Sequence, residues 1–308
     1  MEYLQSFTGE SAAIGTAVFF AISSTLFAIA GRRVGASAVN RSRLLVAAFI
    51  AIAIYWVTRG EPIPAGLSNT VWLWLGASGV IGLALGDDLL FRAYVLIGPA
   101  LSMLIFGLVP AIAAGLGWVF LGETLSSSEI SGIAVTLFGV FWVVTAPKQQ
   151  AAQSSGHDHQ GHRGHGWGLL FAFGGACGQA LGLVTAKIGL SQGASPQAAN
   201  CIRLLAAAAA VWLVTVFSGR ARQTLQMWTH NREASALTVL GALSGPIGGV
   251  WLSLVAIEHA PVGVASTLMS LTPLFLLPIG RLVFREPITL RALAGTVLAI
   301  AGVAILLQ

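Results

Sequence analysis

The stretch VPAIAAGLGWVFLGETLSSSEISGIAVTLFG, residues 109–139, returns in altered form as TPLFLLPIGRLVFREPITLRALAGTVLAIAG, residues 272–302. The two copies align without a gap at a shift of 163 positions. They agree mainly at glycine, proline and one carboxylate, whose backbone and packing roles are hard to replace. The agreeing pairs are Pro110 and Pro273, Gly117 and Gly280, Glu123 and Glu286, Gly132 and Gly295, and Gly139 and Gly302. This duplication predicts a fold made of two related halves.

The match continues upstream of both copies. At the same shift, Gly82, Gly86 and Ala93 fall on Gly245, Gly249 and Ala256, and with small gaps Asn40 and Arg43 resemble Asn200 and Arg203. The repeat therefore extends over most of the chain. We divide the sequence into a first repeat at 1–146, a linker at 147–166 and a second repeat at 167–308.

The composition indicates a membrane protein. The chain of 308 residues is 56% hydrophobic and only 9% charged, with a mean hydropathy of +0.83. Soluble domains carry roughly a quarter charged residues, so this chain lacks the charge to cover a water-facing surface. Apolar segments without Asp, Glu, Lys or Arg run through 11–31, 44–58, 62–86, 93–122, 130–147, 164–186, 204–219, 234–257, 260–280 and 292–308.

These segments predict an all-α integral membrane protein with ten transmembrane helices, five in each half. A spanning helix needs about 20 predominantly apolar residues, and the two shortest segments can extend across Arg43 and Arg203. An odd number of crossings per half turns the second half over relative to the first. The expected architecture is therefore a pair of inverted five-helix repeats, which in secondary transporters move about a central site.

The two copies also carry a family resemblance. Each copy has a small residue before proline, an apolar helix, a glutamate after Gly or Arg, and a helix with two glycines seven positions apart. In the first copy these are Val109-Pro110, Gly122-Glu123, Gly132 and Gly139. In the second copy they are Thr272-Pro273, Arg285-Glu286, Gly295 and Gly302. In this the chain resembles the EamA-type permeases of the drug/metabolite transporter superfamily. The resemblance implies a secondary carrier for a small organic metabolite such as an amino acid, which exports it by proton coupling or by exchange.

Charges within the third apolar region are the first candidates for a transport site. Asp87, Asp88 and Arg92 stand inside it, where an ionisable group costs several kcal/mol unless it is paired or hydrated. Asp88 and Arg92 are four positions apart and can pair on one helical face. Asp87 has no such partner in its own helix, and we interpret it as the candidate proton carrier. The second repeat has Val250, Trp251 and Val255 at these positions, so the fold does not require the charges.

Further candidates lie on other helices. Arg43 and Arg203 begin the second and seventh helices, where each could bind a substrate carboxylate or could reach the lipid headgroups; Lys187 invites the same two interpretations. Gln179 and Trp251 could line the transport cavity or serve as ordinary contacts between helices. Pro110 and Pro273 are expected to kink the fourth and ninth helices as gating elements. Glu123 and Glu286 are expected to cap the starts of the fifth and tenth helices.

The linker holds four of the six histidines, His157, His159, His162 and His165. Such a tract can bind a divalent metal weakly, and a divalent-metal transporter that uses this loop is one alternative function. The membrane segments contain few metal ligands, however, so we interpret the tract as a solvated linker with at most an accessory metal site. A second alternative is a membrane scaffold that transports nothing.

The remaining features bear on partners and location. The chain has no Gly-Lys-Ser/Thr phosphate loop and no Cys-x-x-Cys or His-Glu-x-x-His motif, so we expect neither an enzyme nor a bound cofactor. Its arginines lie at segment ends and form no nucleic-acid stripe, and the expected partners are a small-molecule substrate and the lipid bilayer. Thirteen Lys and Arg residues follow odd-numbered segments and three follow even-numbered ones. This bias predicts that both termini lie outside the cytoplasm. We expect a protein of the plasma (bacterial inner) membrane that is a monomer or a homodimer.

Overall fold

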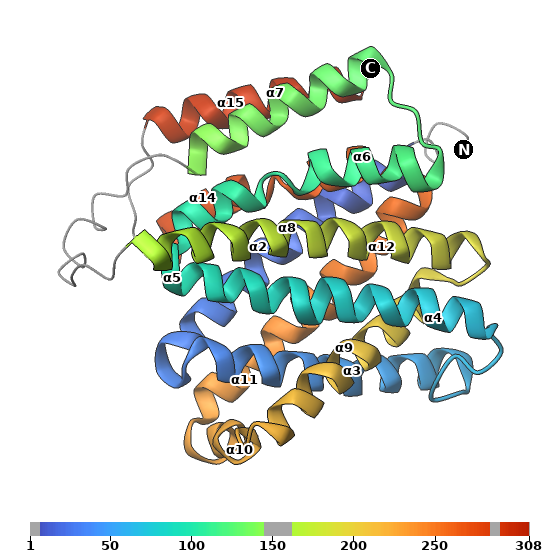
Figure 1. Ribbon diagram of the computed structural model, residues 1–308, viewed down its shortest axis with the longest axis vertical. Coiled ribbons are helices and arrows are strands. Elements are labelled where there is room, and N and C mark those ends of the chain that lie inside the picture. Colours follow the sequence, from blue (N-terminus) through green and yellow to red (C-terminus); the bar gives the residue numbers. More distant parts are fainter. Residues whose placement is uncertain (1–6, 145–161, 284–289, 308) are drawn as a thin grey trace.

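The computed structural model describes residues 7–144, 162–283 and 290–307, and among these residues it contains helices and no strand (Figure 1). The first repeat contains α2 (Thr8–Val34), α3 (Ala36–Arg59), α4 (Asn69–Ser78), η1 (Gly79–Gly86), α5 (Asp87–Phe106), α6 (Val109–Leu121) and α7 (Ser127–Val144). The second contains α8 (His162–Ser191), α9 (Pro196–Phe217), α10 (Ala221–His230), α11 (Arg232–Ala242), η3 (Leu243–Gly249), α12 (Val250–His259), α13 (Val262–Met269), α14 (Thr272–Val283) and α15 (Leu290–Leu306).

Seven of the described helical rods are long and apolar enough to cross a membrane. They include two composite rods, Asn69–Ala93 and Arg232–His259, in which a stretch of π-helix joins two α-helices without a break. Three further apolar helices are shorter, at Val109–Leu121, Ser127–Trp142 and Leu290–Leu306. The structure is thus an all-helical membrane protein. It also forms the short helix α10, which the apolar pattern does not predict.

The two composite rods are related by the repeat down to their backbone. The π-helical segments η1 and η3 cover equivalent stretches of the two halves, since Gly82 and Gly245 lie within them at the shift of 163. A π-helical turn widens the backbone and occurs frequently at functional sites. The duplication therefore preserves a π-helical segment in each half as well as the repeated glycines within it.

A second distortion recurs in the helices that follow. Leu108 donates its amide to Ile105 at 3.0 Å where α5 gives way to α6, and Leu271 donates to Leu268 at 3.2 Å where α13 gives way to α14. Each tight turn directly precedes the helix whose second residue is proline, because proline lacks an amide proton and fits the first turn of a helix. The prolines therefore mark breaks in these helices.

The repeated glycines near the end of each half join α7 to α15, which lie side by side in Figure 1. A Cβ on Gly132 would lie 2.6 Å from Leu306 Cα, and Gly139 and Gly302 pack equally closely on Ala299 and Thr136. Contacts that move up one helix as they move down the other show that α7 and α15 run antiparallel. Small residues permit this close approach of two backbones in a membrane protein.

The remaining helices interlock the two halves. Helix α8 packs on η1 and α5, α2 packs on α11, η3 and α12, and α3 packs on α9. Gly82 in η1 lies against Gly182 in α8, and its repeat partner Gly245 lies against Ser23 in α2. The interior between the repeats is therefore formed by both halves.

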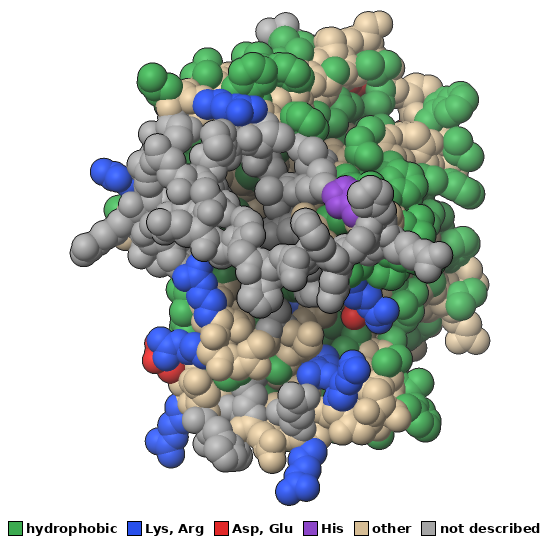
Figure 2. Space-filling model, turned by 60° about the vertical axis from the view of Figure 1, so that its left-hand side comes forward, with side chains coloured by type: hydrophobic (Ala, Val, Ile, Leu, Met, Phe, Trp, Pro, Cys, Tyr) green, Lys and Arg blue, Asp and Glu red, His purple; other side chains and the backbone are tan. Residues whose placement is uncertain are grey.

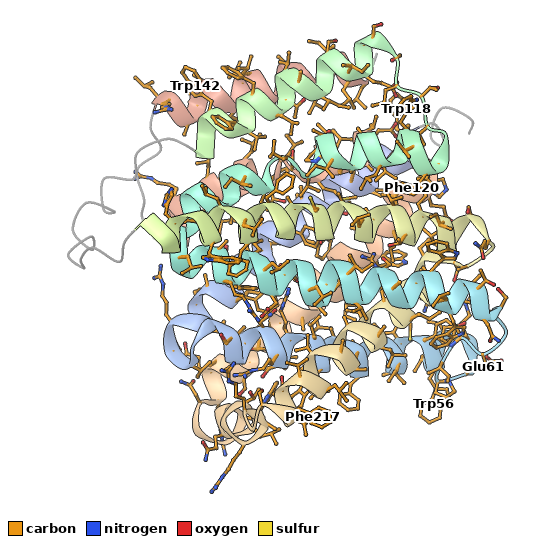
Figure 3. All side chains as sticks on the ribbon, in the orientation of Figure 1. Trp56, Glu61, Trp118, Phe120, Trp142 and Phe217 are labelled. Atoms are coloured by element: carbon orange, nitrogen blue, oxygen red, sulfur yellow. The ribbon has the colours of Figure 1, made fainter. Side chains whose placement is uncertain are left out.

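The outer surface is apolar. Figure 3 shows Trp56, Trp118, Phe120, Trp142 and Phe217 pointing away from the bundle, and each is at least 41% exposed. A water-facing surface does not carry so many large exposed apolar side chains, whereas a lipid-facing one does. This surface agrees with the membrane location predicted from composition.

Candidate functional site

An ion pair lies inside the bundle where α3 meets the junction of η1 and α5. Arg43 in α3 pairs with Asp87, the first residue of α5, and the two side chains are only 15% and 20% exposed. Arg43 Nε also donates to Asn40 Oδ1 at 2.7 Å, and the guanidinium carbon lies 5.6 Å from the centre of the Phe27 ring. Three contacts, from α5, from α3 itself and from α2, thus fix the position of Arg43.

This pairing gives Asp87 a partner that the sequence does not show. The sequence offers Asp87 no partner within its own helix, and its role as the candidate proton carrier stays a prediction. Its partner lies 44 positions earlier in the chain, on a different helix. Helix packing supplies this contact, and the local spacing of charges could not show it.

Arg203 in α9 adds a second positive charge beside this pair. It is 1% exposed and is the largest fully buried side chain of the described residues. Its Nε and Nη1 have no hydrogen-bond partner within the described part of the chain. Asp87 attracts it electrostatically but is bonded to Arg43. A buried charge without full pairing costs several kcal/mol, so an arginine kept in this state inside a membrane bundle is a candidate for binding a ligand.

The two arginines occupy matching depths in their helices. Arg43 is seven residues beyond Ala36 and Arg203 is seven residues beyond Pro196, which places each about 10 Å along its helix. The helices α3 and α9 start at opposite ends of the bundle (Figure 1). Both arginine side chains are enclosed by the bundle, since Arg43 is 15% exposed and Arg203 is 1% exposed.

Gly82 lies beside Arg203 and is packed against α8. A Cβ on Gly82 would lie 3.3 Å from Gly182 Cα, 3.7 Å from Gln179 Oε1 and 3.8 Å from Arg203 Nη2, so both polar side chains approach this glycine next to the contact between the two backbones. Gln179 Oε1 and Asn200 Oδ1 are buried acceptors without a hydrogen-bond partner in the described structure. Asn200 donates its Nδ2 to the η3 carbonyls of Pro246 and Ile247 at 3.2 and 3.4 Å. Both π-helical segments therefore border the site.

Other candidate residues lie outside this enclosure. Asp88 and Arg92 form the predicted pair four residues apart, at 2.7 Å, but their side chains are 49% and 60% exposed. Trp251, which matches Asp88 in the repeat, is 43% exposed and is not enclosed with the arginines. The adjacent carboxylates Asp87 and Asp88 thus have different surroundings, because neighbouring helical residues point about 100° apart.

Glu123 does something that the sequence analysis did not predict. Its Oε2 accepts the Val262 amide at 2.8 Å, at the start of α13, and its Oε1 lies 2.5 Å from Lys187 Nζ. Lys187 also donates to the Ala260 carbonyl at 2.6 Å. We call these four residues the terminal clasp, because it lies at the end of the bundle that holds the chain termini. The expectation that Glu123 caps the fifth helix is wrong: it caps a helix of the other half.

The repeated glycines explain how Glu123 reaches that position. Gly122 ends α6 in the left-handed conformation, with φ of 67°, and turns the chain back on itself. A Cβ on Gly117 would lie 2.6 Å from Glu123 Oε2, so only glycine leaves room for the returning carboxylate. The spacing of Gly117, Gly122 and Glu123 was the available signal. Glu286, its repeat partner, lies outside the described residues.

The prolines lie beside the breaks described above. Pro110 and Pro273 are the second residues of α6 and α14, so they begin helices after a turn and do not kink one in its interior. The Met269 carbonyl, which proline at 273 cannot satisfy, accepts a hydrogen bond from Thr272 Oγ1 at 2.8 Å. The broken helices keep their backbone groups satisfied, as membrane burial requires.

The histidine tract is only partly described. His157 and His159 lie outside the described residues, His162 begins α8, and His165 is exposed in that helix. Among the described residues we find no group of three or more His, Cys, Asp or Glu side chains arranged to hold a metal ion. The proposal of an accessory metal site in the linker remains a prediction.

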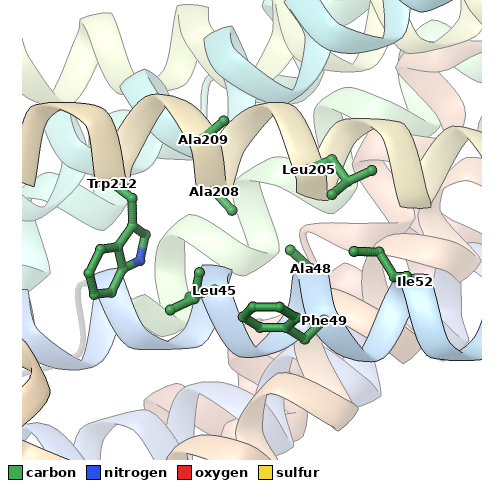
Figure 4. A pocket seen from close by; sticks show the side chains of 8 residues that line it. All are labelled: Leu45, Ala48, Phe49, Ile52, Leu205, Ala208, Ala209 and Trp212. Carbon is green, nitrogen blue, oxygen red and sulfur yellow. The ribbon is translucent and has the colours of Figure 1, made fainter. Parts of the chain in front are cut away.

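A separate groove lies between α3 and α9 and has a volume of about 220 Å³ (Figure 4). Its lining consists of aliphatic and aromatic side chains, including Leu45, Phe49, Leu205 and Trp212. The Trp212 Nε1 proton is donated to the Arg41 carbonyl at 3.1 Å. The groove therefore presents no polar group for a water-soluble substrate, and it differs in chemistry from the arginine site.

Basic side chains gather at the end of the bundle opposite the termini. Figure 2 shows Lys and Arg side chains spread over this end beside the apolar flank. The exposed arginines here lie in the last turn of α2, in or beside α10, or in the last turn of α14; they are Arg32, Arg33, Arg220, Arg222, Arg232 and Arg281. The distribution of charge is therefore strongly unequal between the two ends.

Apolar helices, an inverted duplication and incompletely paired charges between the halves define a membrane protein with the architecture of a two-repeat transporter. The model of the EamA-like transporter family matches residues 7–145 and 166–308. The chain belongs to this family of transporters, within the drug/metabolite transporter superfamily, and this agrees with the expectation that it is not an enzyme.

Comparison of structures gives the same fold. A crystal structure, described only as that of a protein, is 19% identical to this chain, with 96% of each chain covered and a TM-score of 0.74. At this identity the likeness establishes the fold alone. No curated protein sequence matches the chain.

Proposed function

We propose that this protein is a secondary carrier that moves a small organic metabolite across the membrane by alternating access. The carrying observation is the buried Arg203, whose guanidinium is incompletely paired at the interface of the two halves. In this proposal the seven long apolar rods and the three shorter apolar helices all cross the membrane, as two inverted five-helix bundles around the site. A scaffold would gain nothing from an unpaired buried charge, whereas a carrier can neutralise it with substrate.

In this mechanism the two bundles rock about the arginine site. Lys187 and Glu123 join the halves at the terminal end, so their contact closes that end in the conformation described here. The turns before α6 and α14 are positions at which helix segments can change direction. Opening the terminal end requires the clasp to separate.

The charge distribution supports an orientation with both termini outside the cytoplasm. The arginine-rich end then faces the cytoplasm, in agreement with the positive-inside rule. We place the protein in the plasma membrane, which is the inner membrane of a bacterium, and assign it an export role. An N-terminal reporter active only outside the cytoplasm tests the orientation, and activity of a cytoplasm-only reporter at that end contradicts it.

Export by this site uses either a proton gradient or exchange with a second solute. Asp87 is the proposed proton carrier, because protonation removes its ion pair with Arg43. The test uses liposomes that contain the purified protein and a cellular metabolite extract, and mass spectrometry then identifies the released solutes. Release that follows an imposed pH gradient in wild type and ignores it in Asp87→Asn supports proton coupling. Release that requires external solute in both proteins supports exchange.

A parallel set of liposomes is supplied with Zn²⁺, Ni²⁺ or Co²⁺. Metal uptake with no metabolite release would replace the proposed function with metal transport. If neither metals nor metabolites cross, the carrier proposal fails.

A further inference from the structure

We propose that the substrate is an organic monocarboxylate and that its carboxylate binds Arg203. This proposal rests on the proposed carrier function and adds the chemical class of the solute. It follows from three properties of the enclosed site, which are the free donors on Arg203, the sum of the charges and the acceptors around Gly82.

The first property is the set of unused donors. Nε and Nη1 of Arg203 are buried without a hydrogen-bond partner among the described residues, and the residue is 1% exposed. A guanidinium matches the two oxygens of a carboxylate either through Nε and Nη2 or through Nη1 and Nη2, so each unused nitrogen of Arg203 belongs to one such fork. Neutral ligands supply weaker acceptors and leave the buried charge uncompensated. An oxyanion is therefore the ligand that satisfies Arg203.

The second property is the charge balance. Arg43, Arg203 and Asp87 sum to one positive charge. One carboxylate brings this sum to zero, whereas a phosphate monoester carries about −1.5 to −2 at pH 7 and overshoots it. A zwitterionic amino acid adds an ammonium whose natural partner, Asp87, already holds Arg43. The balance selects a monoanion over both.

The third property is the pair of acceptors beside the arginine. Gln179 Oε1 and Arg203 Nη2 both lie within 4 Å of the position that a Cβ on Gly82 would take, and Asn200 precedes Arg203 by about one turn of α9. Both oxygens are buried and without a partner in the described structure. A hydroxyl on the ligand can donate to such an acceptor while the carboxylate occupies the guanidinium. The site thus suits a small hydroxylated acid as well as a simple one.

The experiment sorts transported solutes by charge. Liposomes with wild-type protein are loaded with metabolite extract, and the solutes released are identified. We expect the released set to consist of monocarboxylates, and we expect Arg203→Gln and Arg203→Lys to slow their release at least tenfold. Lysine keeps the charge and loses the fork, so its failure separates bidentate binding from charge alone. Arg92→Gln, at an exposed and already paired arginine, is the matched control and keeps the wild-type rate.

Asp87→Asn tests the charge balance against Asp88→Asn as its neighbour control. Removing the Asp87 charge leaves two positive charges at the site. The dissociation constant for lactate should therefore fall or stay constant in Asp87→Asn. Alanine, the zwitterion of the same size, should bind to this variant no better than to wild type. If Asp87 held a substrate ammonium instead, Asp87→Asn would abolish alanine binding. That result overturns the proposal, as does release of neutral or zwitterionic solutes alone by wild type.

A folding control keeps these results decisive. Thermal unfolding of each variant in detergent shows whether it retains the native structure, and unchanged anion release by a folded Arg203→Gln protein overturns the proposal. If wild type releases no solute, the carrier function fails, and the anion site is judged separately by stabilisation of the purified protein with lactate, gluconate and acetate against chloride. Stabilisation that Arg203→Gln abolishes supports the site; no stabilisation by any of the three acids overturns it.

Discussion

Lys187 and Glu123 lie 2.5 Å apart, nitrogen to oxygen, and join the second half of the chain to the first at the end that holds the termini. The same glutamate caps α13 through the Val262 amide, and the same lysine binds the Ala260 carbonyl. One ion pair thus connects α6, α8 and the turn between α12 and α13. In an alternating-access carrier, a contact of this kind determines how much of the time that end stays closed.

Lys187→Met is therefore expected to favour opening at the terminal end. Cys201 is 1% exposed in α9 and reports on opening without an added label. In a Cys177→Ser background, its rate of reaction with a maleimide should rise about tenfold, which corresponds to a shift of about 1.4 kcal/mol in the equilibrium. Glu129→Gln changes a half-buried glutamate that accepts the Ser126 amide at the start of α7, away from the clasp, and serves as the control. Equal labelling rates in Lys187→Met and wild type would remove the clasp from the mechanism.

Arg203→Met should separate stability from transport. Replacing a buried, incompletely paired charge with an apolar side chain of similar volume is often neutral or stabilises a protein by about 1–4 kcal/mol. We expect the melting temperature of this variant to equal or exceed that of wild type, while substrate release is lost. A marked fall in melting temperature would show that Arg203 is a structural residue whose partners lie outside the described contacts.

Gly82→Ala should impair anion binding at a smaller cost in stability than Gly182→Ala. The added methyl group lies 3.3 Å from Gly182 Cα, so α8 must move slightly, and it borders both Arg203 and Gln179 beside the proposed anion site. Gly182→Ala places its methyl group 2.8 Å from Gly82 Cα, which overpacks two backbones and should cost about 1–3 kcal/mol. Transport assays and thermal melts of the two variants distinguish a blocked site from a strained one.

Gly115→Ala provides the control for that pair. Gly115 lies in α6, and a Cβ there meets no described atom within 4 Å. Alanine is the better helix former by about 1 kcal/mol, so this variant should be at least as stable as wild type and fully active. Full activity in Gly82→Ala as well would show that the ligand binds elsewhere.

Replacing His157, His159, His162 and His165 with serine should leave metabolite transport unchanged. The four residues lie in or beside the linker, and the arginine site uses none of them. Binding of Zn²⁺ or Ni²⁺ by the intact protein, measured by equilibrium dialysis, should weaken in the variant if the tract is an accessory metal site. A loss of metabolite transport would assign the linker a direct part in the cycle.

The sequence could predict those parts of the fold that depend on repetition. The shift of 163 positions aligned Gly139 with Gly302, and the structure uses this pair to bring α7 and α15 together. It also aligned the glycines of η1 and η3. Repeated small residues indicate close backbone approach whichever helices are involved, because no other residue type allows it. Hydropathy gave the number of apolar segments, but three of the corresponding helices are shorter than a full span.

The partners of the charged residues could not be predicted in the same way. The sequence identified Arg43, Asp87, Arg203 and Gln179 as candidates, and the structure places them around one enclosed region. It could not show that Asp87 pairs with Arg43 instead of remaining unpaired. That contact depends on the relative rotation and depth of α3 and the η1–α5 rod, which are set by packing over whole helices. The contact of Glu123 with Val262, 139 positions away, depends on packing between repeats.

The most direct test of alternating access is counterflow in reconstituted liposomes. Liposomes loaded with a high concentration of the transported solute are diluted into a trace of the same labelled solute, and uptake of label is followed with time. A carrier with one site that faces each side in turn should accumulate label transiently above its equilibrium level, and folded Arg203→Gln protein should not. Label that enters wild-type liposomes only to equilibrium, at a rate independent of the internal solute, would contradict a carrier mechanism.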